Sequence, residues 1–336
     1  MFKRTLLLIA LASLLTWAPG AARPLQAAST RFIRIATLVP RDSDLARSFL
    51  KLDKALRSAS QGAWGIRLYP GGVAGDEPDV LRKMKIGQMD ASIITTTGLS
   101  HIVREIAVLD TPGVIHDYRE FEAVTSTLQR DWETSFEQAG WKLIGWSETG
   151  QYRWFSTDPI QRPSDLRARR PWLWPASFIL KELYHVIGCN GVPLGVPEVY
   201  GALQTGMIDT VISTAAALVA LQWHPKLHHM TQQTFGVLIN GLVMSGAKWK
   251  QLPPDIADKL VAEAHKVIAA ERADVRAADE RAYQNLLKRG YVADTWAENG
   301  HREYLEVEQK VRERLVNRLY PQELLQRVLN VAKSAS

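Results

Sequence analysis

Two histidines four residues apart are the first feature of the chain that could do chemistry. His224 and His228 would share one face of a helix, and that spacing can chelate a zinc ion. No carboxylate or cysteine nearby completes a ligand set, and Pro225 disturbs the turn between the two rings. The single cysteine, Cys189, also excludes a multi-cysteine metal cluster and an intrachain disulfide. We therefore expect no metal site.

Sequence motifs of catalysis give no support for an enzyme. The chain contains no Gly-x-Gly-x-x-Gly, phosphate-binding loop, His-Glu-x-x-His or Gly-x-Ser-x-Gly pattern. The glycine-rich run 71–75 lacks the lysine and the spacing that a phosphate cradle needs. Cys189 stands beside Gly188 and Asn190 without any base that the sequence reveals, which favours a packed thiol over a nucleophile. We predict a protein that is not an enzyme and needs no cofactor.

Length and charge bound the remaining possibilities. With 336 residues, 46% hydrophobic and 23% charged, the chain has an ordinary globular composition and is long enough for about two domains. The formal net charge is +6, but basic and acidic residues are interleaved and form no polybasic segment. This pattern gives little support for a nucleic-acid partner.

The segment 1–27 has the layout of a cleavable secretory signal peptide. Lys3 and Arg4 precede an apolar run, and small residues follow, so cleavage after Ala22 or after Ala27 fits the pattern. An uncleaved anchor helix is the alternative, although the run is short for a membrane span and no later apolar run approaches about 18 residues. Export of a chain with one cysteine fits a bacterial periplasm. We predict a soluble periplasmic protein.

The rest of the chain alternates predicted strands and helices, which indicates an α/β fold with parallel sheets covered by helices. Short apolar runs indicate the strands, and apolar positions with helical spacing indicate the helices. The first set comprises strands at 32–38, 64–69 and 91–95 and helices at 45–56 and 77–86. The second set comprises strands at 153–155 and 208–212 and helices at 177–186 and 198–203, with a further strand at 236–244. Two α/β lobes are the natural interpretation.

One predicted helix is too long to fit within a single lobe. Residues 255–289 run without glycine or proline, which predicts a helix about 50 Å long. A lobe of about 150 residues has a radius of gyration of only about 15 Å, so the helix must cross between lobes, kink or project into solvent. Apolar residues from Ile256 to Leu286 need partners along the whole length, which favours crossing. A coiled-coil dimer helix is the alternative, but the charge-dense stretch 272–280 makes a weak heptad seam.

The segment Pro197-Glu-Val-Tyr-Gly-Ala-Leu-Gln-Thr-Gly-Met-Ile-Asp209 resembles the best-known signature of TRAP-type periplasmic solute receptors, the DctP-like family. The long helix is also a feature of that family, and the resemblance covers about 31–320, nearly the whole chain after the signal peptide. Further stretches resemble the same family in the same order, namely 71–77, 86–90, 107–112, 141–150, 163–166 and 249–254.

The resemblance implies a two-lobed periplasmic binding protein fold, in which each lobe is a mostly parallel sheet flanked by helices. The implied lobes are 28–152 with 239–278, and 153–238 with 279–336, bridged by the helix 255–289. Such a receptor closes by a hinge motion on one small ligand. It then delivers the ligand to the integral membrane subunits of a transporter driven by an ion gradient, and it meets the membrane only through that partner.

Several positions depart from the family pattern, and they bear on which residues hold the ligand. In the family, an arginine commonly binds the ligand carboxylate. The matching position in this chain is Trp172, or Arg170 if the alignment is shifted by two residues. The chain therefore resembles a variant that lacks this carboxylate-binding arginine. A second family arginine matches Arg153 with a one-residue uncertainty, and a structural salt bridge at the hinge is its alternative role. Polar family positions become Ser213 and Ser245. The candidate ligand-binding residues are Glu77, Tyr152, Arg153, Arg170, Trp172, Trp174, Ser213 and Ser245.

Tryptophans favour an apolar pocket. The chain has eleven, and Trp146, Trp154, Trp172 and Trp174 crowd the segments that the resemblance places at the cleft, although core and hinge packing is the alternative for each. Glu77 matches a pocket position of the family, but complementarity with a helix N-terminus would also explain it. With the clamp arginine lost, we predict a ligand with a sizeable hydrophobic or aromatic part, still an acid, held by the second family arginine.

Two other functions stay open. A periplasmic sensor or carrier of lipid or other hydrophobic ligands on the same fold would be favoured by an apolar pocket and by a gene neighbour other than a transporter subunit. A hydrolase or lyase on a two-lobed scaffold is weaker, because no nucleophile, base and oxyanion group occur together. We predict a solute receptor.

Overall fold

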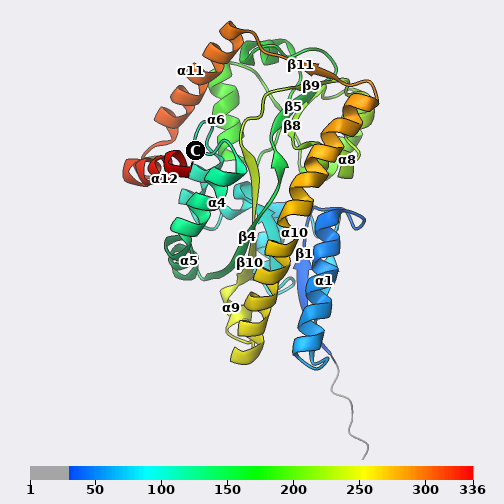
Figure 1. Cartoon of the computed structure of the whole chain (residues 1–336), viewed down its shortest axis with the longest axis vertical. Coiled ribbons are helices and arrows are strands. Elements are labelled where there is room, and N and C mark those ends of the chain that lie inside the picture. The colour runs from blue at the N-terminus through cyan, green and yellow to red at the C-terminus, as the bar shows by residue number, and fades with distance from the viewer. Residues whose placement is uncertain (1–29, 336) are drawn as a thin grey trace, which may run out of the picture.

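The computed structural model describes residues 30–335, so the predicted signal peptide 1–27 lies outside the described residues. Two β-sheets lie one above the other in Figure 1, each with helices around it, and the 35-residue helix α10 (Pro254–Lys288) runs beside both. The predicted fold of two α/β lobes with one long spanning helix is confirmed. In the described part of the chain, no helix is both long enough and apolar enough to cross a membrane.

The first sheet has five strands in the order β2-β1-β3-β10-β4. Helices cover both of its faces, so neighbouring residues of a central strand are both buried: Ile93 and Ile94 are 7% and 2% exposed and belong to separate core clusters. The strands are β1 (Arg31–Ala36), β2 (Trp64–Tyr69), β3 (Ala91–Thr95), β4 (Trp141–Gln151) and β10 (Val237–Ser245).

The second sheet has four short strands in the order β11-β9-β5-β8, and a separate two-stranded sheet pairs β6 with β7. Its core holds Trp154 and Phe155 of β5, which are 2% and 0% exposed. The strands are β5 (Arg153–Ser156), β6 (Trp172–Leu173), β7 (Val192–Pro193), β8 (Thr210–Ser213), β9 (His229–Thr231) and β11 (Val292–Asp294).

The directions of the strands differ from the prediction of mostly parallel sheets. In the first sheet β1 pairs parallel with β2 and β3, but β10 runs antiparallel to both of its neighbours. In the second sheet β5 is antiparallel to β8 and β9, and only β9 and β11 are parallel. The reason is that the chain crosses between lobes on extended strands: β4 continues into β5 after Tyr152 alone, and β10 brings the chain back. A strand that returns must run against the one that left.

The helices occupy the faces and ends of the two sheets (Figure 1). Ser43 is the N-cap of helix α1, and its Oγ accepts a hydrogen bond from the Ala46 backbone N–H at 3.2 Å. The helices other than α10 are α1 (Asp44–Ala59), α2 (Glu77–Lys85), α3 (Thr96–Leu99), α4 (Tyr118–Thr127), α5 (Gln129–Gln138), α6 (Phe178–Ile187), α7 (Val199–Thr205), α8 (Ala215–Ala220), α9 (Gly246–Trp249), α11 (Glu298–Leu315) and α12 (Gln322–Ala335).

Helix α10 joins the two lobes through a buried carboxylate as well as through apolar packing. It lies against α1 and β4 of the first lobe and against α8 of the second. Asp279 is 7% exposed, and its carboxylate accepts hydrogen bonds from the backbone N–H groups of Gln151 at 3.0 Å and Ala216 at 2.9 Å. The close approach requires glycine at position 150, where a Cβ would lie 2.3 Å from the Asp279 Cγ. One side chain of α10 thus ties the strand that crosses between the lobes to the start of α8.

The last two helices pack on different lobes. Helix α11 lies against α6 of the second lobe, whereas α12 lies against α4 of the first (Figure 1). The lobe boundaries predicted from the sequence assign all of 279–336 to the second lobe. In the structure, α12 lies on the first lobe because its apolar face, which includes Leu325 and Val328, packs into the core beside α4.

Candidate functional site

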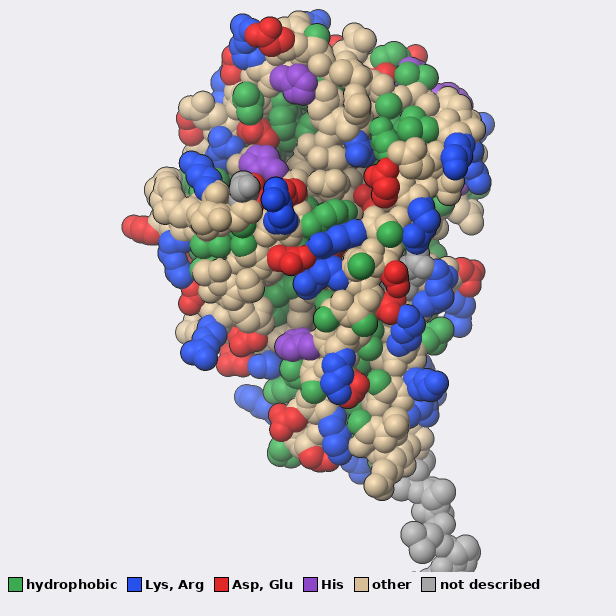
Figure 2. Space-filling model, in the orientation of Figure 1, with side chains coloured by type: hydrophobic (Ala, Val, Ile, Leu, Met, Phe, Trp, Pro, Cys, Tyr) green, Lys and Arg blue, Asp and Glu red, His purple; other side chains and the backbone are tan. Residues whose placement is uncertain are grey.

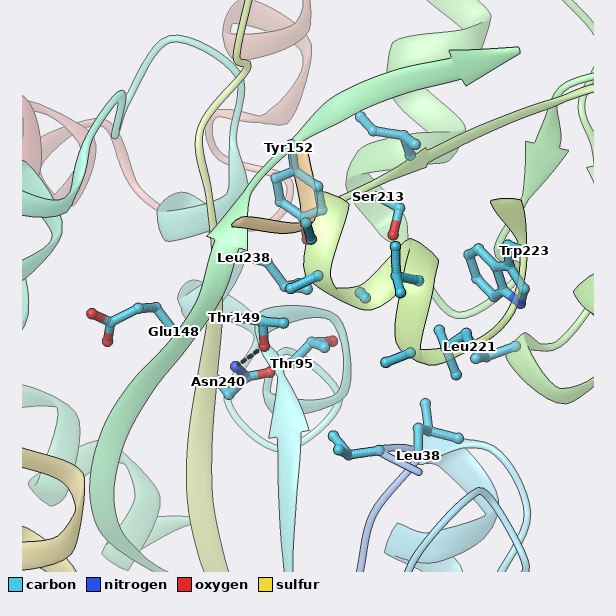
Figure 3. A pocket seen from close by; sticks show the side chains of 18 of the residues that line it. Leu38, Thr95, Glu148, Thr149, Tyr152, Ser213, Leu221, Trp223, Leu238 and Asn240 are labelled. Carbon is cyan, nitrogen blue, oxygen red and sulfur yellow. Dashed lines mark hydrogen bonds between the residues drawn. The ribbon is translucent and has the colours of Figure 1, made fainter. Parts of the chain in front are cut away.

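A cavity of about 620 Å³ lies between the two lobes, and both lobes supply its walls. The first lobe contributes the segment after β1, the start of α2, the end of β3 and parts of β4 and β10. The second lobe contributes β6, the start of α6, and the end of β8 with α8. Segments at the carboxyl ends of parallel strands are where open α/β sheets place ligands, as β1 and β3 do here. Figure 3 shows the side chains that converge on this space.

The second lobe supplies an aromatic wall. The rings of Trp172 and Trp174 stack with centroids 6.0 Å apart, and Trp223 meets Trp172 edge-on at 5.2 Å. The indole N–H of Trp172 donates to the Leu194 carbonyl oxygen at 2.8 Å, which fixes the ring in its lobe. Figure 3 shows Trp223 and Leu221 on the same side of the cavity. Such a wall suits a flat or apolar part of a ligand.

The first lobe supplies polar groups that are mostly engaged with one another. The Glu77 carboxylate accepts hydrogen bonds from the backbone N–H of Thr95 at 2.8 Å and from its hydroxyl at 2.9 Å. Burial raises the pKa of Glu77 to about 8, against the hydrogen bonds from Thr95 that lower it. The Asn240 side-chain amide donates to the Thr149 hydroxyl oxygen at 2.9 Å (Figure 3). All four residues line the cavity.

Three further carboxyl groups line the cavity: Asp42, which is exposed, and Glu148 and Asp110, whose surroundings differ. Glu148 points away from the other labelled side chains in Figure 3, and its carboxylate pairs with the Arg276 guanidinium of α10 at 2.7 Å. Asp110 makes no ion pair in the described part of the chain, and the hydroxyls of Thr96 and Tyr152 lie near it. Burial raises the pKa of Asp110 to about 7, and the nearby hydroxyls oppose the rise.

Among the described residues, three basic side chains line the cavity, one from α1 and two from the C-terminal part of α10 and its cap. They are Arg47, Arg281 and Arg289, all exposed, and no lysine or histidine among the described residues lines the cavity. Arg289 contacts the His224 ring at 3.2 Å, whereas Arg281 has no hydrogen-bond or ion-pair partner within residues 30–335. Lys and Arg side chains are spread among acidic ones over α10 and α1 on the face shown in Figure 2.

Contacts across the cleft hold the lobes closed in this structure. Asp76, the N-cap of α2, accepts hydrogen bonds through Oδ2 from the Trp174 indole N–H at 2.9 Å and the Val196 backbone N–H at 3.2 Å. His101 of the first lobe is hydrogen-bonded through Nε2 to the Ala176 carbonyl of the second at 2.9 Å. Together these contacts close the cleft beside the aromatic wall.

Five of the eight candidate residues from the sequence line the cavity: Glu77, Tyr152, Trp172, Trp174 and Ser213. Of the other tryptophans weighed for the cleft, Trp146 and Trp154 lie in the core and do not line the cavity. The ligand contacts of the five stay a prediction, as does the loss of the family clamp arginine.

The other three candidates have partners outside the cavity. The Arg153 guanidinium donates to the carbonyl oxygens of Thr231, at 3.0 Å, and Gln232, and it lies 4.3 Å from the ring centroid of Tyr283. The side chain of Arg170 is exposed and pairs with Asp209 at 3.3 Å, and Ser245 caps α9 through the Lys248 backbone N–H at 3.3 Å. Each of the three side chains thus has a partner within the protein, and ligand contact by any of them stays a prediction.

Asp110, Thr149 and Asn240 line the cavity although sequence reasoning did not select them. A usable signal existed for two of them. Asn240 is the one side-chain amide within the apolar strand predicted at 236–244, and Asp110 is the one acid within the run Ala107-Val-Leu-Asp-Thr-Pro112. A lone polar residue in a buried run must find a partner, and a cavity wall offers one.

The two α/β lobes enclose a cavity, and each lobe supplies one of its walls. Strands and one spanning helix connect the lobes as a hinge. This architecture defines a two-lobed solute-binding receptor. The chain belongs to the bacterial extracellular solute-binding proteins, family 7 (DctP), whose family model matches residues 35–317. The predicted identity as a TRAP-type solute receptor is thereby confirmed.

Individual relatives agree with this assignment. The chain is 21% identical over 245 residues to the C4-dicarboxylate-binding periplasmic protein DctP of Vibrio cholerae, covering 73% of this chain and 74% of that protein. Its fold is similar to that of the sugar acid binding protein DctPAm of Advenella mimigardefordensis in complex with galactonate, with a TM-score of 0.85, 17% identity, and coverage of 92% and 99% of the two chains. A TRAP periplasmic solute binding protein of Shewanella oneidensis with bound succinate gives a TM-score of 0.84 at 17% identity, covering 90% and 99%.

Proposed function

We propose that this receptor binds a small organic acid with a sizeable apolar part in the periplasm and delivers it unchanged to the membrane subunits of a TRAP transporter. The observation that carries the proposal is the cavity of about 620 Å³ between the lobes, within the range of about 300–1,000 Å³ that is usual for small-ligand pockets. The relatives named above, which bind galactonate and succinate, support an acid.

The aromatic wall supports the apolar part of the ligand. Trp172, Trp174 and Trp223 present indole surfaces that a sugar acid or short dicarboxylate would cover poorly. A ring or branched apolar group would displace water from these surfaces, and each Å² of apolar area buried contributes about 25 cal/mol.

We propose that the acid group of the ligand binds at Arg281 of α10, a basic side chain of the cavity that makes no hydrogen bond or ion pair within residues 30–335. The sequence placed the acid group at Arg153, but two carbonyl oxygens already accept hydrogen bonds from its guanidinium. A carboxylate at Arg281 would keep its charge near water, where the cost of desolvating the ion pair is small.

A carrier or sensor of hydrophobic ligands is the second candidate function, and the same aromatic wall supports it. Gene neighbourhood separates the two, since a receptor of this kind needs transporter subunits encoded nearby. An apolar ligand without an acid group would also bind equally well to wild type and to Arg281→Gln, whereas an organic acid would bind the variant more weakly.

The test is to isolate the ligand with the protein. The receptor, purified under mild conditions and then denatured, should release a small organic acid that mass spectrometry identifies, and the same compound should raise the melting temperature of the emptied protein. Recovery of the compound chemically altered after incubation would contradict the receptor function. Failure of any small molecule to raise the melting temperature would contradict it as well.

A further inference from the structure

Three neighbouring strands of the first sheet place polar side chains side by side at the cavity. Thr95, at the end of β3, is the cross-strand partner of Asn240 on β10. The Asn240 side-chain amide in turn donates to the hydroxyl oxygen of Thr149 on β4 at 2.9 Å. All three residues line the cavity, and Figure 3 shows their side chains together. The first lobe thus offers one continuous polar surface, built on β3, β10 and β4.

Two hydrogen-bonding groups on this surface have no partner in the protein. Asn240 is 6% exposed, and within residues 30–335 its side chain makes only the hydrogen bond to Thr149. Its amide oxygen is not one of the fully buried atoms of these residues that lack a partner, so this oxygen reaches accessible space, which at Asn240 is the cavity. The Thr149 hydroxyl accepts the bond from Asn240 and makes no other in the described part of the chain, which leaves its O–H to donate.

An acceptor beside a donor is complementary to a hydroxyl group. A hydroxyl can donate to the Asn240 amide oxygen and accept from the Thr149 O–H, so it would satisfy both groups at once. An oxo group only accepts, and it would leave the buried amide oxygen without a donor. A buried polar group without its hydrogen bond is costly, so the pair discriminates between these two oxygen functions.

A carboxylate fits this polar surface poorly. It only accepts hydrogen bonds, so an oxygen that it placed beside the Asn240 amide oxygen would have no proton between them. The hydrogen bonds of the Thr95, Thr149 and Asn240 side chains within residues 30–335 include none to a basic group. Burying an ionised group without a cation costs far more than burying a hydroxyl with both of its hydrogen bonds. The surface therefore suits a neutral part of the ligand.

We infer that Asn240 and Thr149 bind a hydroxyl group of the ligand, which makes the ligand a hydroxylated organic acid. The inference rests on the proposed function and specifies the class of its ligand. Asn240 and Thr149 are specificity-determining residues in this arrangement. An acid that lacks the hydroxyl would displace water from the Asn240 amide oxygen and return no hydrogen bond, so it would bind more weakly.

The experiment compares acids that share one skeleton and differ in one group. 3-Phenylpropanoate is the parent acid, and its derivatives carry a hydroxyl on carbon 2, on carbon 3 or on the ring, or an oxo group on carbon 2. Each compound is titrated into the emptied mature receptor, and its dissociation constant is measured by calorimetry. We expect at least one hydroxylated derivative to bind about tenfold or more tightly than both the parent acid and the oxo derivative.

Substitutions at Thr149 test the contact itself. Thr149→Val removes the hydroxyl and keeps the shape of the side chain, whereas Thr149→Ser keeps the hydroxyl. We expect Thr149→Val to weaken binding of the hydroxylated acid by about tenfold and to leave the parent acid nearly unchanged, and Thr149→Ser to restore most of the affinity.

Ser147→Ala is the matched control for these variants. Ser147 lies on the same strand as Thr149, is buried and is the cross-strand partner of Asn240, but it does not line the cavity. The control also removes one hydroxyl from β4 and should change the affinity for neither acid. Circular dichroism and the melting temperature of the unliganded protein establish that the variants fold.

The outcomes separate the inference from the proposed function. A parent acid that binds as tightly as every hydroxylated derivative would overturn the inference, and so would equal effects of Thr149→Val on the two kinds of acid. If no compound of the series binds, the compound released from the purified receptor decides. The inference is wrong if that compound has no hydroxyl besides its carboxyl group, or if Thr149→Val binds it as tightly as wild type. The receptor function stands in each of these cases, whereas it fails together with the inference if nothing binds and nothing is released.

Discussion

We predict that the hydrogen bond between Trp174 and Asp76, which connects the two lobes, stabilises the closed state of the receptor. Trp174→Phe removes the indole N–H that donates to Asp76 Oδ2 at 2.9 Å and keeps a ring that can stack on Trp172. A hydrogen bond to a charged group contributes about 1.5–3 kcal/mol when it is buried. Asp76 is half-buried and keeps the Val196 N–H as a second donor from the same lobe as Trp174, so we expect a loss around the bottom of that range, about 1–2 kcal/mol.

That loss falls on the closed state alone, because the two partners belong to different lobes. The closed state holds the ligand, so affinity should fall by about 5–30-fold, mainly through faster dissociation. Calorimetry with the released ligand and stopped-flow dissociation, followed by tryptophan fluorescence, measure the two quantities. The melting temperature of the unliganded protein should change little.

Trp296→Phe is the matched control for that variant. Trp296 is buried, and its indole N–H donates to the Ile160 carbonyl oxygen at 2.8 Å, but both residues belong to the second lobe and neither lines the cavity. The control should lower the melting temperature and leave the dissociation rate unchanged. Equal affinities of Trp174→Phe and wild type, or equal losses in the two variants, would refute the role of the contact in closure.

Three further predictions concern stability. Burial raises the pKa of Glu77 to about 8, so the folded state holds this proton more tightly than the unfolded chain does. The free energy of unfolding should therefore fall as pH rises from about 5 to 8, and Glu77→Gln should flatten part of that slope in urea titrations. Asp279→Ala leaves the N–H groups of Gln151 and Ala216 without their acceptor and should cost about 2–4 kcal/mol of unfolding free energy; a cost below about 0.5 kcal/mol would contradict this reasoning. Arg153→Lys should lower the melting temperature with little change in affinity; the reverse result would support the ligand contact predicted from the sequence.

The sequence predicted best those helices and strands whose first and last residues are set by the neighbouring sequence. The strands 64–69 and 91–95 have the predicted bounds, because apolar runs end there at proline, glycine or polar residues. The helix predicted at 255–289 is found at 254–288, since no glycine or proline interrupts it. Strand β4 was not predicted as a strand. Its polar and glycine positions do not form an apolar run, and only its pairing with β10 makes it the longest strand among the described residues.

The site was harder to predict because it depends on which way a side chain faces. Tyr152 and Arg153 are adjacent where β4 passes into β5, and successive side chains of an extended chain point to opposite sides. Tyr152 lines the cavity, so Arg153 turns to the other side, where it meets Thr231 and Tyr283. A resemblance with a one-residue uncertainty could not decide between the two sides. Asp110 was missed for a different reason, since its neighbours in space, Tyr152 and Thr96, come from other parts of the chain.

The chain crosses between the lobes four times, at β4 into β5, at β9 into β10, along α10, and between α11 and α12. These crossings have a consequence for how such a receptor can change its specificity. Each lobe is assembled from segments that are separated in the gene, so a single recombination event cannot exchange one intact lobe for that of a relative. A junction between β4 and β5, for example, would mix origins within the first sheet, because β10 lies beyond the junction, and a junction within α10 would mix the second sheet, because β11 lies beyond it. New ligand preferences are therefore accessible mainly through individual substitutions in the walls, and a library for redirecting this receptor is better built from point replacements than from swapped blocks.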